Sequence, residues 1–112
     1  GTLSITIKNF DRAIQLLNQA ILIQPNHAKS YNNLGVVFSK LGEVKKAMGY
    51  YQKAINILPN YADAHSNLGT IFNGLGEFQK AISCYQKAIS IQSDHTDSHY
   101  NLCNALDKLN RY

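Results

Sequence analysis

Three side chains near the end of the chain have the types and the spacing of metal ligands. His95, His99 and Cys103 follow one another at intervals of four residues, so they would share one face of a helix. No carboxylate that could orient such ligands is evident beside them. We therefore expect no metal and no cofactor, and the alternative role for these side chains is packing.

Catalytic chemistry has less support in the sequence. Serine, histidine and aspartate are all present, but no spacing between them is typical of a nucleophile and its base. Gly74 and Gly76 do not form a phosphate-binding loop, because they fit the closing turn of a helix. We expect that the chain is not an enzyme.

Asparagine recurs at one interval along the chain. Asn33, Asn67 and Asn101 are 34 residues apart. An amide side chain both donates and accepts hydrogen bonds, so it can pair with the N–H and the C=O of an extended peptide. The other interpretation is that these amides bond only within or between helices of the protein, and the sequence leaves both open.

Charge and composition exclude several classes of protein. The 112 residues carry a formal charge of +4 with only two arginines, Arg12 and Arg111, which is less than a nucleic-acid binder usually shows. No apolar run approaches the ~20 residues that span a membrane. Cys84 and Cys103 have no pairing motif, which favours a reducing, cytoplasmic location. We expect neither nucleic acid nor membrane as a partner.

The positions of these residues are set by an internal repeat. When the chain is shifted by 34 residues, 16 of the 34 pairs between residues 28–61 and 62–95 are identical. The same register continues outward at both ends. The chain is therefore predicted to be one domain with a partial repeat over 1–27, full repeats over 28–61 and 62–95, and the first helix of a further repeat over 96–112.

Each repeat contains two helical patterns. Tyr31, Leu34, Phe38 and Leu41 follow spacings of three and four, which places them on one helix face. Gly42 then suits a left-handed helix end. A second apolar face runs from Val44 to Leu58, and Pro59 ends that helix. Asn26, Asn60 and Asp94 precede the odd helices and are predicted to be N-caps.

Small residues recur on the apolar faces. Gly35 and Gly69 lie inside helices, where glycine costs up to ~1 kcal/mol relative to alanine. The compensation that we infer is close approach, with the rings of Tyr51 and Tyr85 packed against bare backbone. Stacked helix pairs of this kind form a solenoid.

This pattern resembles the tetratricopeptide repeat, and the resemblance covers the whole chain. It is carried by the following residues of the first full repeat: Tyr31, Leu34, Gly35, Phe38, Ala47, Tyr51, Ala54 and Pro59. The resemblance implies an all-α, right-handed superhelix of antiparallel helix pairs that binds a protein or an extended peptide on its concave surface. His65 and His99 replace the first aromatic residue, Ser93 the proline, Cys103 the glycine, and Lys8 and Asn110 the turn glycine.

The resemblance also implies that the first helix of each repeat lines the concave surface. The predicted peptide-binding residues are Lys29, Asn32, Asn33, Asp63, Ser66, Asn67, Thr70, Asn73, Asp97, Tyr100, Asn101 and Asn104, with Val36, Ser39, Lys40, Asp107 and Lys108 beside them. This surface is polar and mostly uncharged. The basic columns Arg12/Lys46/Lys80 and Lys53/Lys87 fall on the second helices instead, where a solvated outer face is expected.

Two more specific relationships follow from particular residues. Residues 61–69 resemble the repeats that precede the catalytic region of O-linked N-acetylglucosamine transferase, in which an asparagine ladder holds protein substrates. A chaperone-tail clamp for a carboxylate is rejected, because it would need basic residues in place of Asn32, Asp97 and Asn101.

Both ends of the repeat array expose apolar residues. Leu102, Leu106 and Leu109 have no partner helix in the pattern, and neither has the remnant that contains Leu3, Ile5 and Ile7. Repeat arrays need polar caps. We therefore predict self-association through the terminal helices.

Overall fold

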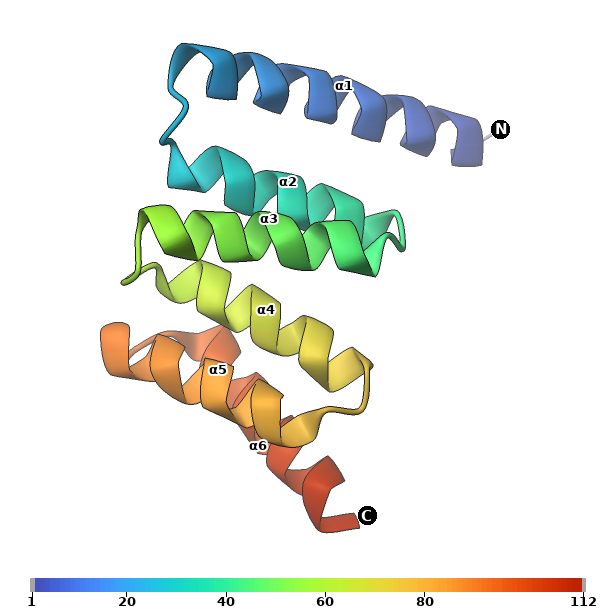
Figure 1. Cartoon of the computed structure of the whole chain (residues 1–112). Helices are drawn as coiled ribbons and strands as arrows, with labels where there is room; N and C mark the ends of the chain where they lie inside the picture. Colours follow the sequence, from blue (N-terminus) through green and yellow to red (C-terminus); the bar gives the residue numbers. More distant parts are fainter. Residues whose placement is uncertain (1, 112) are drawn as a thin grey trace. The chain divides into compact units, whose positions relative to one another are not determined.

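The computed structural model describes the backbone of residues 2–111 and the side chains of residues 8–111. Every element in this part of the chain is α-helical (Figure 1). The helices are α1 (Thr2–Ile23), α2 (Ala28–Lys40), α3 (Val44–Ile57), α4 (Ala62–Gly74), α5 (Phe78–Ile91) and α6 (Thr96–Arg111). They form two compact units, unit 1 from Gly1 to Ile57 and unit 2 from Leu58 to Tyr112.

Antiparallel helix pairs make up each unit. In unit 1, α2 packs along α3, and α1 packs against α2 (Figure 1). In unit 2, α5 packs against both α4 and α6. The predicted all-α architecture of antiparallel helix pairs is confirmed.

Glycine ends the first helix of each full repeat, as the pattern predicts. Gly42 and Gly76 both have φ of 81° and are the only described residues with positive φ. A left-handed residue of this kind turns the chain sharply without steric cost when it has no Cβ. The N–H of Glu43 then bonds to the carbonyl of Phe38, and that of Glu77 to the carbonyl of Phe72.

The two positions where the turn glycine is replaced, Lys8 and Asn110, do not form the turn that Gly42 and Gly76 form. Helix α1 runs unbroken through Lys8, and α6 runs unbroken through Asn110. Leu3, Ile5 and Ile7, expected as the remnant of a separate first helix, therefore belong to the same helix as the residues after Lys8, because a residue with a Cβ continues a right-handed helix at lower cost than it adopts the left-handed conformation of a turn. The side chains of Leu3, Ile5 and Ile7 lie outside the described residues.

The N-caps are displaced by one residue from their predicted places. His27 and Tyr61 are the N-cap residues and have an extended backbone, whereas Asn26 and Asn60 lie one residue earlier, in a turn. The reason is a tight turn before the helix, in which the N–H of His27 bonds to the carbonyl of Gln24 and places Asn26 inside the turn. The same turn precedes α6, where the N–H of His95 bonds to the carbonyl of Gln92, so the prediction for Asp94 is also wrong.

Tyrosine rings on bare helix backbone form the core of both units. A Cβ built on Gly35 would lie 2.5 Å from Cε1 of Tyr51, and one on Gly69 would lie 2.9 Å from Cε1 of Tyr85. Tyr51 is 3% exposed and Tyr85 is fully buried. The inferred close approach of ring and glycine is confirmed in both repeats.

Around Tyr85, unit 2 builds its apolar cluster. Ala81 and Ala105 are fully buried beside the ring, and Phe72 and Leu102 pack on the outside of this group. Alanine at both positions lets α5 and α6 approach closely enough to enclose the ring. Leu102 thus serves the core of unit 2 and is not part of a free end face, which corrects its predicted role.

Burial of the two tyrosines predicts a loss of stability in alkali. Burial raises the pKa of Tyr51 from 10.0 to about 12 and also raises the pKa of Tyr85. Because the folded state holds the proton more tightly, stability should be constant below pH ~10 and fall as the pH rises through the folded-state pKa. Urea unfolding followed by circular dichroism from pH ~8 to ~12 measures this.

Matched tyrosine variants test the cause. The double variant Tyr51→Phe/Tyr85→Phe should lose less stability between pH ~10 and ~12 than the parent chain. Tyr100→Phe, at a tyrosine that is 72% exposed, should follow the parent. The same alkaline loss in the double variant would exclude the buried hydroxyls as the cause.

Candidate functional site

One stripe of polar side chains runs along the first helix of each repeat. Its members follow intervals of four, three and four residues, which keeps them within about 60° of one another around the helix. We call it the polar stripe, and it consists of Lys29, Asn33, Val36 and Lys40 on α2, Asp63, Asn67 and Thr70 on α4, and Asp97, Asn101, Asn104 and Lys108 on α6. All of these side chains are exposed or half-buried, so the stripe is open to a ligand within each unit.

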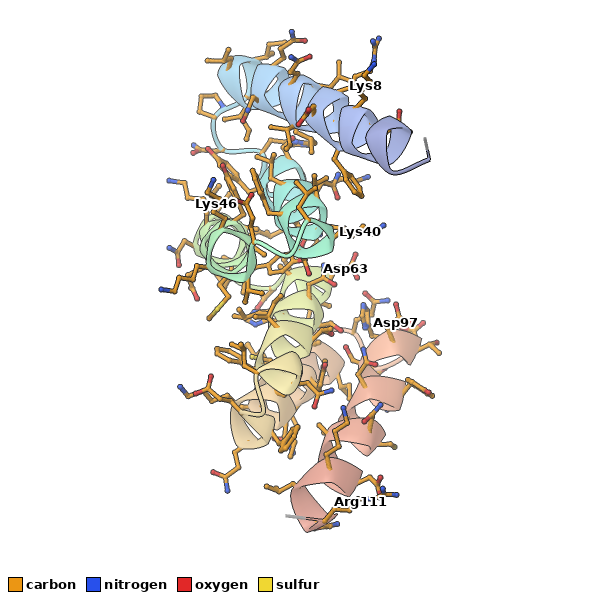
Figure 2. The ribbon with its side chains drawn as sticks, turned by 90° about the vertical axis from the view of Figure 1, so that its right-hand side faces the viewer. Lys8, Lys40, Lys46, Asp63, Asp97 and Arg111 are labelled. Atoms are coloured by element: carbon orange, nitrogen blue, oxygen red, sulfur yellow. The ribbon has the colours of Figure 1, made fainter. Side chains whose placement is uncertain are left out.

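The asparagines occupy equivalent places in the stripe. Asn33, Asn67 and Asn101 are all half-buried, each one turn after an exposed charged residue. Figure 2 labels two of those charged residues, Asp63 and Asp97, at the first turns of α4 and α6. A half-buried amide is held in orientation by its surroundings, and an amide group has one acceptor oxygen and two N–H donors.

Two predicted site residues do not fit an open surface. Asn32 is 5% exposed and Ser66 is 3% exposed, so a ligand cannot reach either side chain as it stands. The equivalent residue on α6, Tyr100, is 72% exposed, and no further helix follows α6 in the described chain. We therefore remove Asn32 and Ser66 from the surface.

Thr70 is hydrogen-bonded within unit 2, whereas Asn73 carries a buried oxygen without a partner among the described residues. The hydroxyl of Thr70 donates to the carbonyl of Ser66 at 3.1 Å, and it lies 3.0 Å from the hydroxyl of Tyr85. Because the single proton of Thr70 is used, the Tyr85 hydroxyl donates in that pair. Asn73 is half-buried, and its Oδ1 is a buried acceptor without a hydrogen-bond partner among the described residues.

A buried histidine joins the starts of α4 and α6. Nε2 of His95 lies 2.6 Å from Oδ1 of Asp63, and Nδ1 lies 2.7 Å from Oγ of Ser98. The backbone N–H of Ser98 also donates to Nδ1, over 3.3 Å. Since Nδ1 accepts, Nε2 carries the proton and donates to the carboxylate. His95 therefore caps the N-terminus of α6 and anchors it to α4.

This chain of Asp63, His95 and Ser98 has the order of a catalytic relay but not its accessibility. Ser98 is 0% exposed, so no substrate carbonyl can approach its hydroxyl. The sequence did not reveal the relay, because Asp63 and His95 are 32 residues apart. The sequence does contain a related local pattern, a histidine followed three residues later by a serine, at both His27/Ser30 and His95/Ser98. His27 and Ser30 make the same contact at the start of α2, with Nδ1 and Oγ 2.6 Å apart.

Replacing His95 by alanine should destabilise unit 2. The variant loses the cap of α6 and leaves the buried Ser98 hydroxyl without its acceptor, which together should cost about 1–2 kcal/mol. Urea denaturation followed by circular dichroism measures the change. Thr96→Ala is the control, since Thr96 is exposed and its one hydrogen bond is 3.5 Å long. Equal stability of the two variants would contradict the anchoring role.

The metal interpretation does not survive the geometry. Nε2 of His99 lies 2.8 Å from the carbonyl of Ser93 and donates to it, while both ring nitrogens of His95 have protein partners. Within the described residues, no three histidine, cysteine or acidic side chains are arranged to hold a metal ion. Contrary to expectation, His99 and Cys103 are exposed and not buried. The glycines equivalent to Cys103 meet a tyrosine from the next helix, and no such helix follows α6 in the described chain.

The bond made by His99 belongs to a recurring contact. The hydroxyl of Tyr31 donates to the carbonyl of Pro25 at 3.2 Å, and Nε2 of His65 donates to the carbonyl of Pro59 at 2.9 Å. Each contact reaches back six residues, as the His99 contact does. Tyrosine and histidine are therefore interchangeable here because both place an N–H or O–H donor at the same distance from the backbone.

None of the described helices is both long enough and apolar enough to cross a bilayer. Unit 1 carries one further surface feature, an aromatic groove between α2 and α3, which lies apart from the polar stripe.

Comparison with known proteins identifies the repeat. The profile described as "Tetratricopeptide repeat" matches residues 28–61 and 62–95, and a second TPR repeat profile matches residues 7–42. No curated protein sequence matches the chain significantly.

Solved structures resemble the chain over most of its length. A crystal structure of MamA matches 94% of this chain at 26% identity and a TM-score of 0.80, and a second MamA structure matches 90% at 29% identity and 0.80. The chain covers 61% and 55% of those two MamA chains.

A third structure, the first TPR of Spaghetti (RPAP3) bound to the HSP90 peptide SRMEEVD, has a TM-score of 0.83 at 16% identity. The match covers 97% of this chain and 86% of that one, and at this identity it shows the fold alone. Because the family profile covers more than half of the residues, the chain belongs to the tetratricopeptide repeat family, whose domains generally mediate protein–protein interactions and are typically non-catalytic.

Proposed function

We propose that this chain binds a partner protein as an extended peptide along the polar stripe. The observation that carries the proposal is the half-buried asparagine that each first helix presents at the same place, namely Asn33, Asn67 and Asn101. One amide can accept from a backbone N–H and donate to a backbone C=O of the peptide. Such contacts recognise the peptide backbone, so the stripe would accept many sequences.

The composition of the stripe favours a peptide without a strict charge requirement. Two of its three first-turn residues, Asp63 and Asp97, are exposed acids, whereas Lys29 is an exposed base. A carboxylate clamp requires basic residues at such positions, and the stripe has acidic ones at two of the three. The structure of Spaghetti (RPAP3), which has a similar fold, holds an HSP90 peptide. We therefore expect the partner's peptide to be held by its backbone and not by a terminal carboxylate.

A peptide-array pull-down with the full chain tests the proposal. Peptides bound by the parent chain should be lost or bound at least about tenfold more weakly by the triple variant Asn33→Ala/Asn67→Ala/Asn101→Ala. The control triple variant, Asn18→Ala/Asn56→Ala/Asn110→Ala, changes three exposed helical asparagines outside the stripe. Binding that both variants retain equally would remove the asparagines from the mechanism.

The relationship to O-linked N-acetylglucosamine transferase remains an alternative. It rests on residues 61–69 and on the asparagine column alone. In that case the stripe would recruit substrates to a catalytic region elsewhere in a longer protein. Adding an authentic transferase substrate peptide to the array discriminates, since the alternative requires that this peptide bind the stripe.

Self-association through the terminal helices also remains a prediction. Leu106 on α6 is 43% exposed, and Leu109 is half-buried. Two exposed aliphatic residues end α1, Leu22 and Ile23, each 81% exposed. Light scattering should show a mass that rises with concentration and falls back in Leu106→Lys. A strict monomer at high concentration would contradict this prediction.

A further inference from the structure

A groove lined by aromatic rings and lysines lies between α2 and α3 in unit 1. It is a shallow groove of about 430 Å³ that is open to solvent, and its lining residues are Tyr31, Phe38, Lys46, Gly49, Tyr50 and Lys53. On α2, Tyr31 and Asn33 are two residues apart, which is about 200° of helical rotation. The groove therefore lies on the opposite side of α2 from the polar stripe. In Figure 2, Lys46 projects on the α3 side of unit 1 and Lys40 on the α2 side.

The rings of the groove are stacked on one another. Phe38 and Tyr50 have ring centroids 5.3 Å apart at 10°, and Tyr31 and Tyr50 have centroids 6.4 Å apart at 27°. Lys46 lies 5.3 Å above the ring of Phe38, and Lys53 lies 5.8 Å above that of Tyr31. The ring faces are therefore engaged by one another and by ammonium groups, and what remains for a ligand is ring edges and positive charge.

Both of these features favour an anionic ligand. The edge of an aromatic ring carries positive partial charge, and the ammonium groups carry full charge. Lys46 has only an exposed partner, Glu43, at 3.6 Å, and no described carboxylate lies within ion-pair distance of Lys53. A nucleobase would need a free ring face on which to stack, so the groove suits carboxylates better than nucleic acid.

The surrounding repeat is the basic part of the chain. Residues 28–61 contain five lysines and one glutamate, which gives +4, the net charge of the entire protein. Residues 62–95 contain two lysines and three acidic residues, which gives −1. Charge complementarity therefore favours an acidic partner at this repeat over the next full repeat.

The internal copy of the repeat lacks the groove's special residues. His65 stands in place of Tyr31, Cys84 in place of Tyr50, and Ser83 in place of Gly49. Lys80 still lies 5.6 Å above the ring of Phe72, so the lysine–ring contact belongs to the repeat in general. The ring stack and the open floor at Gly49 belong to unit 1 only, and they make the equivalent surface of unit 2 a natural control.

We propose that the α2–α3 groove binds an acidic segment of a partner polypeptide. An apolar side chain of that segment lies over Gly49, where a Cβ would meet no atom within 4 Å. Carboxylates on either side of it pair with Lys46 and Lys53, which are seven residues apart and hence about 10 Å along α3. The site is separate from the polar stripe, so the protein has two distinct binding surfaces.

Fluorescence anisotropy with one defined probe tests this site. The probe is a labelled peptide with a central phenylalanine flanked by glutamates, and it should bind the full chain. Gly49→Leu places a side chain in the groove at a position where an added Cβ has open space, and Lys46→Gln/Lys53→Gln removes the charge of the groove. Each should weaken binding about tenfold or more. Circular dichroism should show both variants folded, since leucine favours a helix over glycine.

Matched variants in unit 2 complete the design. Ser83→Leu and Lys80→Gln/Lys87→Gln make the same changes on the equivalent surface and should leave the affinity unchanged. The triple asparagine variant of the polar stripe should also bind the probe normally, which separates the two proposals. A probe with glutamine in place of glutamate should not bind.

Three results would overturn the proposal. The first is no binding of the acidic peptide by the parent chain, and the second is equal weakening by Gly49→Leu and Ser83→Leu. The third is equal binding of an oligothymidine of the same charge that Gly49→Leu leaves intact, since this would indicate a general cationic surface. The expected pattern is loss in unit 1 variants only, and only for the acidic peptide.

Discussion

Replacing Tyr85 by alanine is expected to lower the free energy of unfolding by about 3–5 kcal/mol. Tyr85 is fully buried, and it packs with Ala81 and Ala105 at the centre of unit 2. Removing the ring leaves a cavity that the surrounding helices cannot fill, because the alanines that enclose it have no longer side chain to offer. Guanidinium unfolding followed by circular dichroism measures the loss.

The companion variant Tyr85→Phe separates the ring from its hydroxyl. Only the 3.0 Å hydrogen bond to Thr70 is removed, so the expected loss is about 1 kcal/mol. Tyr100→Ala is the control, because it makes the same tyrosine-to-alanine change at a site that is 72% exposed. If Tyr85→Ala lost no more than Tyr100→Ala, the ring would not be the centre of the core.

Replacing Gly35 by alanine should destabilise the protein, whereas the same change at Gly49 should stabilise it. The Cβ at residue 35 would lie 2.5 Å from Cε1 and 2.6 Å from Cδ1 of Tyr51, which is 3% exposed and has nowhere to move. Overpacking of this kind costs about 1–3 kcal/mol. At residue 49 the new methyl group meets nothing within 4 Å, so the helix gains up to ~1 kcal/mol.

The comparison is decisive because the expected stability changes of Gly35→Ala and Gly49→Ala have opposite signs. Both glycines lie inside helices, so helix propensity alone predicts stabilisation in both variants. Thermal unfolding of the two single glycine variants, of Tyr51→Leu and of Gly35→Ala/Tyr51→Leu measures the effect, and Gly35→Ala should cost less stability when residue 51 is leucine than when it is tyrosine. A stabilising Gly35→Ala would show that the ring does not determine the need for glycine.

The sequence by itself determined the repeat and its helix pairs. Helical periodicity, the left-handed glycines Gly42 and Gly76, and the pairing of small with large residues are encoded locally and confirmed twice within one chain. The internal repeat is informative because both copies must fold with the same helix packing, so each pattern is tested twice. At Lys8 and Asn110, where the turn glycine of the repeat is replaced, the backbone continues as a helix.

The candidate sites could be predicted from the sequence only in part. Periodicity placed Asn33, Asn67 and Asn101 on one stripe, but it could not show that Asn32 and Ser66 are buried, since burial depends on which neighbour each helix face meets. Asn32 and Asn33 are neighbours on α2, yet Asn32 is buried and Asn33 is partly exposed.

Only the tertiary structure decided how distant side chains meet. The contact of His95, in the turn before α6, with Asp63 on α4 joins residues far apart in the sequence, and so does the stack of Tyr31 and Phe38 on α2 with Tyr50 on α3. Such contacts depend on interhelical distances and rotations to within about an ångström, and hydrogen bonds lose their strength beyond that tolerance. A linear pattern specifies which face a residue occupies, whereas the packing of whole helices specifies what that residue touches.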